Sequence, residues 1–246
     1  MASEQAAFVV SDERTDYAPF AFPDNHVGEG QRSERRLVLR RGERLRAACL
    51  KLWRIVDGLV ALCVLLPDGR RQIVCLSTPG DVVCPVSTQA FGDIWVEALT
   101  PSEVEEIDLA AQHRDIGREP GLTAALFSLV HQQVKCASSH LVTLGRLDGM
   151  ERVCLFLADM AWRVGQDTPG GRRVHLPLSR EDIADYLGLN AETVSRIFSR
   201  VKKTKLAIFL SPTDYLVTDM AALERRAPIS PTHRPATEQH GMERQV

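Results

Sequence analysis

The first half of the chain alternates short apolar runs with turn-forming residues. Asp57-Gly58 and Pro67-Asp68-Gly69 are two of the intervening segments, and Asp-Gly is favoured in tight hairpins because glycine adopts positive φ without steric cost. Short strands at a spacing of about ten residues are typical of an all-β sandwich or jelly roll. We therefore predict such a domain over residues 37–112, with strands in the apolar runs at 37–39, 50–56, 59–66, 72–76, 94–99 and 104–109.

The apolar period then changes to steps of three and four residues, which is one stripe of a helix. A helix over residues 122–144 would be about 35 Å long at ~1.5 Å per residue. We predict a long helix within residues 117–147 that pairs with its copy in a second subunit; the alternative is a core helix packed within one chain. The predicted dimer contacts are Leu126, Val130, Val134, Ala137, Leu141 and Leu144.

A further helix is predicted over residues 149–165, and residues 176–203 then predict two short helices joined by a tight turn. Ser179 can cap the first of them together with Asp182 three residues later. Gly188 permits the left-handed turn, and Asn190 can cap the second helix. Apolar runs at 206–210 and 214–218 predict a hairpin that forms a wing beside this helix-turn-helix.

The outer face of the second short helix carries Glu192, Ser195 and Arg196, at positions i, i+3 and i+4. Arginine donates to guanine, glutamate accepts from cytosine, and this part of the motif enters the major groove. Residues 172–205 hold eight Lys or Arg against four Asp or Glu in a chain of net charge −2. The alternative is an exposed Glu192–Arg196 pair with no further role. We assign DNA phosphate contacts to Ser179, Arg180, Thr193, Arg200, Lys202 and Lys203.

Composition narrows the function classes. The chain is 44% hydrophobic and 25% charged, with 30 Lys plus Arg against 32 Asp plus Glu, which argues against binding to nucleic acid or membrane by bulk charge. It has no run of about 18 apolar residues and no signal-peptide pattern, so we expect a cytoplasmic protein with no membrane partner. The polar segments 1–36 and 226–246 are predicted to be disordered.

The cysteines stand singly, without a CxxC pair, and this argues against a zinc or dithiol site. Scattered cysteines in a reducing compartment are mostly small buried hydrophobes. We expect neither a metal site nor catalytic residues. The six are Cys49, Cys63, Cys75, Cys84, Cys136 and Cys154.

The order of the elements and three motifs resemble the family of the cyclic-AMP receptor protein and the fumarate-nitrate regulator (CRP/FNR). The motifs are Pro67-Asp68-Gly69-Arg70-Arg71-Gln72-Ile73, Pro79-Gly80-Asp81 and Glu192-Thr193-Val194-Ser195-Arg196, the last resembling the E-x-x-S-R pattern of the FNR and FixK branches. The resemblance implies an α+β fold: an N-terminal β-roll at 37–112, like the jelly roll of cyclic-nucleotide-binding domains, a dimerisation helix at 117–147 and a C-terminal winged helix-turn-helix at 149–225.

The same resemblance implies a sequence-specific transcription factor that is not an enzyme. Its partners would be double-stranded DNA, a second copy of the chain, and RNA polymerase contacted through the roll and wing. The implied DNA site is a palindrome of the TTGA(T/C)–N4–(A/G)TCAA kind.

The roll departs from the branch that binds cyclic nucleotides. That branch continues G-D-x-x-G-E and places Arg-Ser or Arg-Thr before the next strand, whereas here Val82-Val83-Cys84-Pro85 follows Asp81 and Gly92-Asp93 stands at the second position. A cyclic phosphate would meet a carboxylate and no arginine, which argues against cyclic AMP.

The chain also lacks the residues that bind other cofactors of the family. The N-terminal arm has no cysteine before Cys49 for an iron–sulfur cluster, and residues 37–112 have no histidine for haem or for a cupin-type metal site. We therefore expect no cofactor. The alternative is a redox, nitric oxide or haem-dependent sensor that acts through a roll cysteine such as Cys84. The competing interpretation is that Cys84 is a buried strand cysteine with no signalling role.

Overall fold

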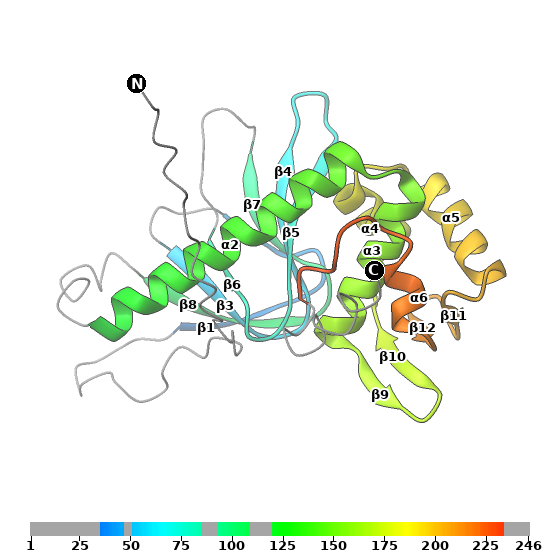
Figure 1. Ribbon diagram of the computed structural model, residues 1–246. Helices are drawn as coiled ribbons and strands as arrows, with labels where there is room; N and C mark the ends of the chain where they lie inside the picture. The colour runs from blue at the N-terminus through cyan, green and yellow to red at the C-terminus, as the bar shows by residue number, and fades with distance from the viewer. Residues whose placement is uncertain (1–34, 47–50, 85–92, 109–119, 234–246) are drawn as a thin grey trace, which may run out of the picture.

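The computed structural model describes residues 35–46, 51–84, 93–108 and 120–233. A β-rich N-terminal region and a helical C-terminal region are joined by the long helix α2 (Pro120–Arg146), which runs diagonally across the roll strands in Figure 1. The predicted α+β class is confirmed. The predictions for residues 1–34 and 234–246, for Cys49, Pro85 and Gly92, and for the limits between 109 and 119 lie outside the described residues.

The N-terminal region is a roll of two antiparallel sheets. One sheet has the order β1-β8-β3-β6 and the other the order β2-β7-β4-β5. Buried Ile55, Val60, Val96 and Val104 pack within one apolar cluster. The strands of the first sheet are β1 (Arg35–Leu39), β3 (Lys51–Asp57), β6 (Val82–Val83) and β8 (Ser102–Asp108). Those of the second are β2 (Arg44–Arg46), β4 (Val60–Leu65), β5 (Arg71–Ser77) and β7 (Ile94–Ala98).

The C-terminal region is built on helix α3 (Gly149–Val164), which begins with a reciprocal cap between Asp148 and Glu151. The following elements are β9 (Gln166–Thr168), β10 (Gly171–His175), α4 (Arg180–Leu187), α5 (Ala191–Lys203), β11 (Ile208–Phe209), β12 (Asp214–Val217) and α6 (Met220–Glu224). The predicted hairpin is β11–β12, which belongs to a four-stranded sheet of order β11-β12-β10-β9.

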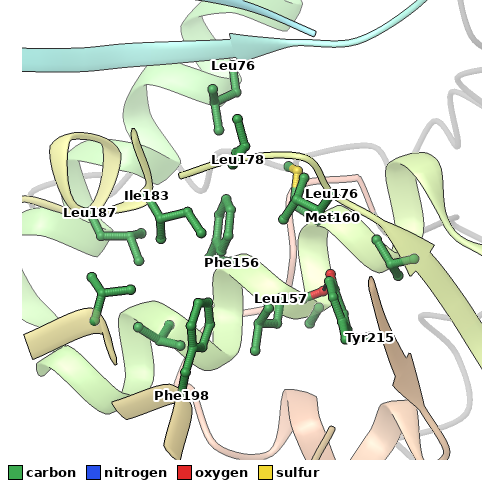
Figure 2. Close-up of a cluster of buried hydrophobic side chains, with 14 of the residues drawn as sticks. Leu76, Phe156, Leu157, Met160, Leu176, Leu178, Ile183, Leu187, Phe198 and Tyr215 are labelled. Carbon is green, nitrogen blue, oxygen red and sulfur yellow. Dashed lines mark hydrogen bonds between the residues drawn. The ribbon is translucent and has the colours of Figure 1, made fainter. Parts of the chain in front are cut away.

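A shared apolar core joins the two regions. Phe156 and Leu157 of α3 lie among side chains of α4, α5 and β12, and Leu76 of the roll reaches the same cluster (Figure 2). The hydroxyl of Tyr215 donates to the backbone oxygen of Leu157 at 2.8 Å, so its one polar atom is satisfied inside the core. The roll is therefore packed directly against the helix-turn-helix and not only connected to it through α2.

Both predicted disordered ends need correction at their inner limits. Strand β1 already begins at Arg35 and pairs with β8. At the other end, residues 226–233 return to the helices: the Thr232 hydroxyl donates to the Ser139 hydroxyl at 2.8 Å, and the backbone N–H of His233 donates to Asp159 at 3.0 Å. These contacts lie far apart in the sequence, which is why polar composition gave no sign of them.

Candidate DNA-binding site

Helices α4 and α5 are set by local capping contacts that the sequence predicts. The Ser179 hydroxyl accepts from the backbone N–H of Asp182 at 3.0 Å, and the Asp182 carboxylate accepts from the Ser179 backbone at 3.2 Å. Gly188 ends α4 in the left-handed conformation at φ 61°, and Asn190 accepts from the Thr193 N–H at 2.7 Å to begin α5. The two caps and the glycine turn are therefore confirmed.

Helix α5 has one buried and one exposed face. Val194, Ile197, Phe198 and Val201 are buried against the core, whereas Glu192, Ser195 and Arg196 are exposed. Arg196 lies 3.8 Å from Glu192 and also donates to the Thr193 hydroxyl at 3.3 Å. An exposed ion pair of this length contributes little to stability, so both side chains can turn to another partner at small cost.

The basic residues at the end of α5 are exposed as well. Arg200, Lys202 and Lys203 have no ion pair among the described residues. Two of the four acids counted in this segment, Asp182 and Asp185, bind Arg71 of the roll. Two of the eight bases in the segment are paired as well, with acids outside it, so the local charge balance stays close to the sequence count.

Three of the predicted phosphate contacts are held by other residues in this structure. The Ser179 hydroxyl donates to Asp182 at 2.8 Å, and the Thr193 hydroxyl accepts from Arg196. The Arg180 guanidinium lies 4.0 Å from the ring centre of Phe198, and burial lowers the pKa of Arg180. Ser179 would have to give up this hydrogen bond to donate to a phosphate, whereas Thr193 keeps its own hydroxyl proton and Arg180 keeps its N–H groups for that purpose.

Helix α2 carries an uncovered apolar face. Val130, Val134 and Leu141 are 57%, 59% and 73% exposed, and Ala137 is exposed beside them, whereas Leu126 and Leu144 are half-buried. Phe127 and Val142, which the stripe of threes and fours omitted, are exposed at 73% and 42%. Along the half-buried edge of this face, Gln133 donates to the backbone oxygen of Val82, and His140 stacks on Tyr186 with ring centres 4.4 Å apart.

Cys84 follows strand β6 and is half-buried. Burial raises the pKa of its thiol, which keeps it in the less reactive protonated form. Asp93, the described half of the Gly92-Asp93 pair, is exposed just before β7. Across the described ranges, no group of three or more His, Cys, Asp or Glu side chains could hold a metal ion.

Sequence reasoning missed the contact between the roll and α4. Arg71 and Gln72 belong to the motif that resembles the family pattern, yet nothing local shows that their side chains reach α4. The partners lie more than 100 residues further along the chain, for example at a separation of 111 residues for Arg71 and Asp182. A cluster of unpaired acids on one face of a predicted helix was the available signal.

Comparison with known families adds to this geometry. The family model described as the Crp-like helix-turn-helix domain matches residues 151–226, which span α3 to α6 and the residues just beyond. The chain is thus a transcriptional regulator of the helix-turn-helix class. Where the structure describes the chain, it contains no helix with the length and apolar character needed to span a membrane.

The most informative relatives are FixK proteins. The chain is 34% identical over 172 residues to the nitrogen fixation regulation protein FixK of Azorhizobium caulinodans, covering 70% of this chain and 69% of that protein. It is 36% identical over 156 residues to FixK of Rhizobium meliloti, covering 63% and 68%. The structure of FixK2 from Bradyrhizobium japonicum matches with a TM-score of 0.71 at 28% identity, over 80% of this chain and 98% of that one. The protein belongs to the CRP/FNR family, among regulators of the FixK and FNR type.

Proposed function

We propose that the protein is a homodimeric transcription factor that reads a palindromic DNA site. The observation that carries the proposal is the exposed face of α5, where Glu192, Ser195 and Arg196 contact only residues of their own helix, whose opposite face is packed into the core. Arginine and glutamate at this part of a recognition helix suit guanine and cytosine edges in the major groove. Arg200, Lys202 and Lys203 supply the adjoining positive charge for phosphates.

The apolar face of α2 supports a two-fold symmetric dimer, and such a dimer would suit a palindromic site. An apolar face as exposed as that of α2 is costly in water and is expected to be covered by a second copy, with Val130, Val134 and Leu141 at its centre. A two-fold axis along α2 would place two α5 helices about one DNA turn, ~34 Å, apart. The site would be of the TTGA(T/C)–N4–(A/G)TCAA kind, with RNA polymerase meeting the roll and wing. The predicted dimerisation helix at 117–147 and DNA-binding unit at 149–225 are kept in this proposal, and the roll predicted over 37–112 begins at Arg35.

Arg196→Ala and Lys202→Ala together test the assignment of the reading face. Arg196→Ala should weaken binding to the palindrome by ~1–3 kcal/mol per half-site and change binding to random duplex much less. Lys202→Ala should weaken both duplexes to a similar degree and lower the salt dependence by about one counterion. Both are measured by fluorescence anisotropy over a salt series. Equal losses from Arg196→Ala on both duplexes would make Arg196 a phosphate contact and contradict the assignment.

Leu141→Glu tests the dimer. A carboxylate in the centre of the apolar face should prevent pairing, because burying it there would leave an unpaired charge. Sedimentation equilibrium should show a dimer for the wild type and a monomer for Leu141→Glu. Val38→Glu, a matched change at an 80% exposed apolar residue of β1, should leave the dimer intact. A dimeric Leu141→Glu variant would place the interface elsewhere.

A further inference from the structure

Arg71, the first residue of β5, joins the roll to the helix-turn-helix through one side chain. Its guanidinium donates to Asp182 at 2.5 Å and to Asp185 at 2.7 Å, both on α4, and to Glu97 of β7 at 2.9 Å. The Arg71 side chain is 20% exposed, and those of Asp182 and Glu97 are 8% and 9% exposed. The contact therefore excludes most water, which strengthens the attraction between the charges.

The cluster around Arg71 is electrically balanced. Arg41 approaches Asp182 at 3.4 Å and Arg44 binds Glu97 at 3.0 Å, so three guanidinium groups face three carboxylates. Both outer arginines are more than half exposed, and only Arg71 contacts all three acids. Burial raises the pKa of Asp182, but hydrogen bonds from Arg71 and Ser179 outweigh this effect and hold the pKa below its usual value.

A second contact from the adjacent residue fixes the same helix. The side-chain amide of Gln72 donates to the backbone oxygen of Asp185 at 2.6 Å. Arg71 and Gln72 thus hold α4 by its carboxylates and by its backbone. Apolar packing supports them, because Ile73 and Leu76 of β5 lie in the same buried cluster as Ile183 and Leu187 of α4.

We propose that Arg71 is a positioning residue for DNA recognition, and this inference rests on the proposed binding of a palindrome. Helix α4 packs against both β5 and α5, whereas α5 lies on the far side of α4 from the roll in Figure 1. Arg71 therefore acts on the reading helix only through α4. By fixing the orientation of α4 relative to the roll and α2, it fixes the separation and angle of the two α5 helices in a dimer.

This role predicts a specific effect on the spacing of the two half-sites. With Arg71 in place, the dimer should discriminate strongly against palindromes whose spacer is one base pair longer or shorter. Arg71→Gln keeps a polar side chain but removes the charge. It should weaken binding to the preferred palindrome about tenfold and reduce the discrimination between spacers, while the base preference within a half-site stays unchanged.

The experiment measures the affinities of the full-length protein for the three spacers and for half-site base substitutions. Arg71→Lys, which can reach fewer of the acids, should fall between wild type and Arg71→Gln. Arg36→Gln is the matched control, because Arg36 pairs with Glu103 at the exposed edge of the same roll; it should behave as wild type. Circular dichroism and sedimentation must show that each variant is folded and dimeric.

Asp185→Asn provides a second route in case Arg71→Gln does not fold, because Asp185 is the most exposed of the three acids at 29%. It should reduce spacer discrimination in the same direction, and the double variant should show less than the sum of the two single effects. Unchanged spacer discrimination in folded Arg71→Gln and Asp185→Asn would overturn the inference, as would an altered base preference within a half-site. A wild type that does not prefer the palindrome over random duplex would instead overturn the proposed function.

Discussion

Helices α4 and α5 belong to one helix-turn-helix, yet the polar side chains of α4 bind the roll and those on the outer face of α5 are exposed. On α4, Asp182 and Asp185 are committed to Arg71 of the roll. On α5, Glu192, Ser195 and Arg196 are exposed, with only weak contacts along their own helix. The difference indicates that α4 is fixed against the roll so that α5 can present its outer face to DNA. A side chain that must bind a ligand cannot be fully satisfied within the protein.

This contrast separates the effects of substitutions into two groups. Changes on α4 or on the inner face of α5 should alter the stability of the folded chain. Changes on the outer face of α5 should alter DNA binding and leave stability nearly unchanged, because exposed side chains away from caps and cores contribute little.

The largest expected effect on stability comes from the inner face of α5. Phe198 is 5% exposed, and its ring centre lies 5.1 Å from that of Phe209. Phe198→Ala should lower the free energy of unfolding by ~3–5 kcal/mol through lost burial and the cavity left behind. Ser195→Ala, on the outer face of the same helix, should change it by less than ~0.5 kcal/mol. Urea denaturation measures both. Similar costs for the two variants would break the distinction between the faces.

A pH effect of intermediate size comes from the packing of α4 against α2. His140 stacks on Tyr186 of α4, its Nε2 has no hydrogen-bond partner among the described residues, and burial, with a smaller effect of Arg152, lowers its pKa to about 4. In the unfolded chain its pKa is near 6.5, so between these values the unfolded chain binds more protons. Stability is therefore full above pH 6.5 and falls as the pH drops toward 4, by about 2 kcal/mol at pH 5.

His140→Phe tests this effect, because phenylalanine keeps the stacked ring but cannot bind a proton. Denaturation between pH 5 and 7 should show a shallower dependence on pH for His140→Phe than for the wild type. The acid effect of Asp182 lies at lower pH, because hydrogen bonds from Arg71 and Ser179 lower the pKa of this carboxyl in the folded chain. An unchanged slope for His140→Phe would show that His140 is not the group responsible.

The smallest predicted effects compare the caps of the two helices. Ser179→Ala should cost ~1–2 kcal/mol, because it removes a cap and also a hydroxyl that donates to the buried Asp182. Asn190→Ala should cost ~0.5–1 kcal/mol, since Asn190 is exposed and makes one capping bond. Thermal and urea unfolding at neutral pH compare the two. A larger cost at Asn190 would contradict the view that α4 is the more tightly held helix.

The local features of the site were determined by the sequence itself. The cap at Ser179, the turn at Gly188 and the two faces of α5 depend on residues three or four positions apart. Such spacings fix neighbours on a helix whatever surrounds it. The apolar stripe on α2 and the alternation of short apolar runs and turns in the roll are also local patterns that the sequence determines.

Only the tertiary structure decided which polar side chains form contacts within the protein and which remain exposed. The sequence contains 32 Asp and Glu and does not indicate which of them Arg71 contacts. The fold brings Glu97, Asp182 and Asp185 to it across separations of 26, 111 and 114 residues. It also places Arg180 over Phe198 and returns His233 to Asp159. Such long-range pairs depend on how whole helices and strands pack. Opposite charges attract at any sequence separation, so these pairs produce no periodic pattern in the sequence.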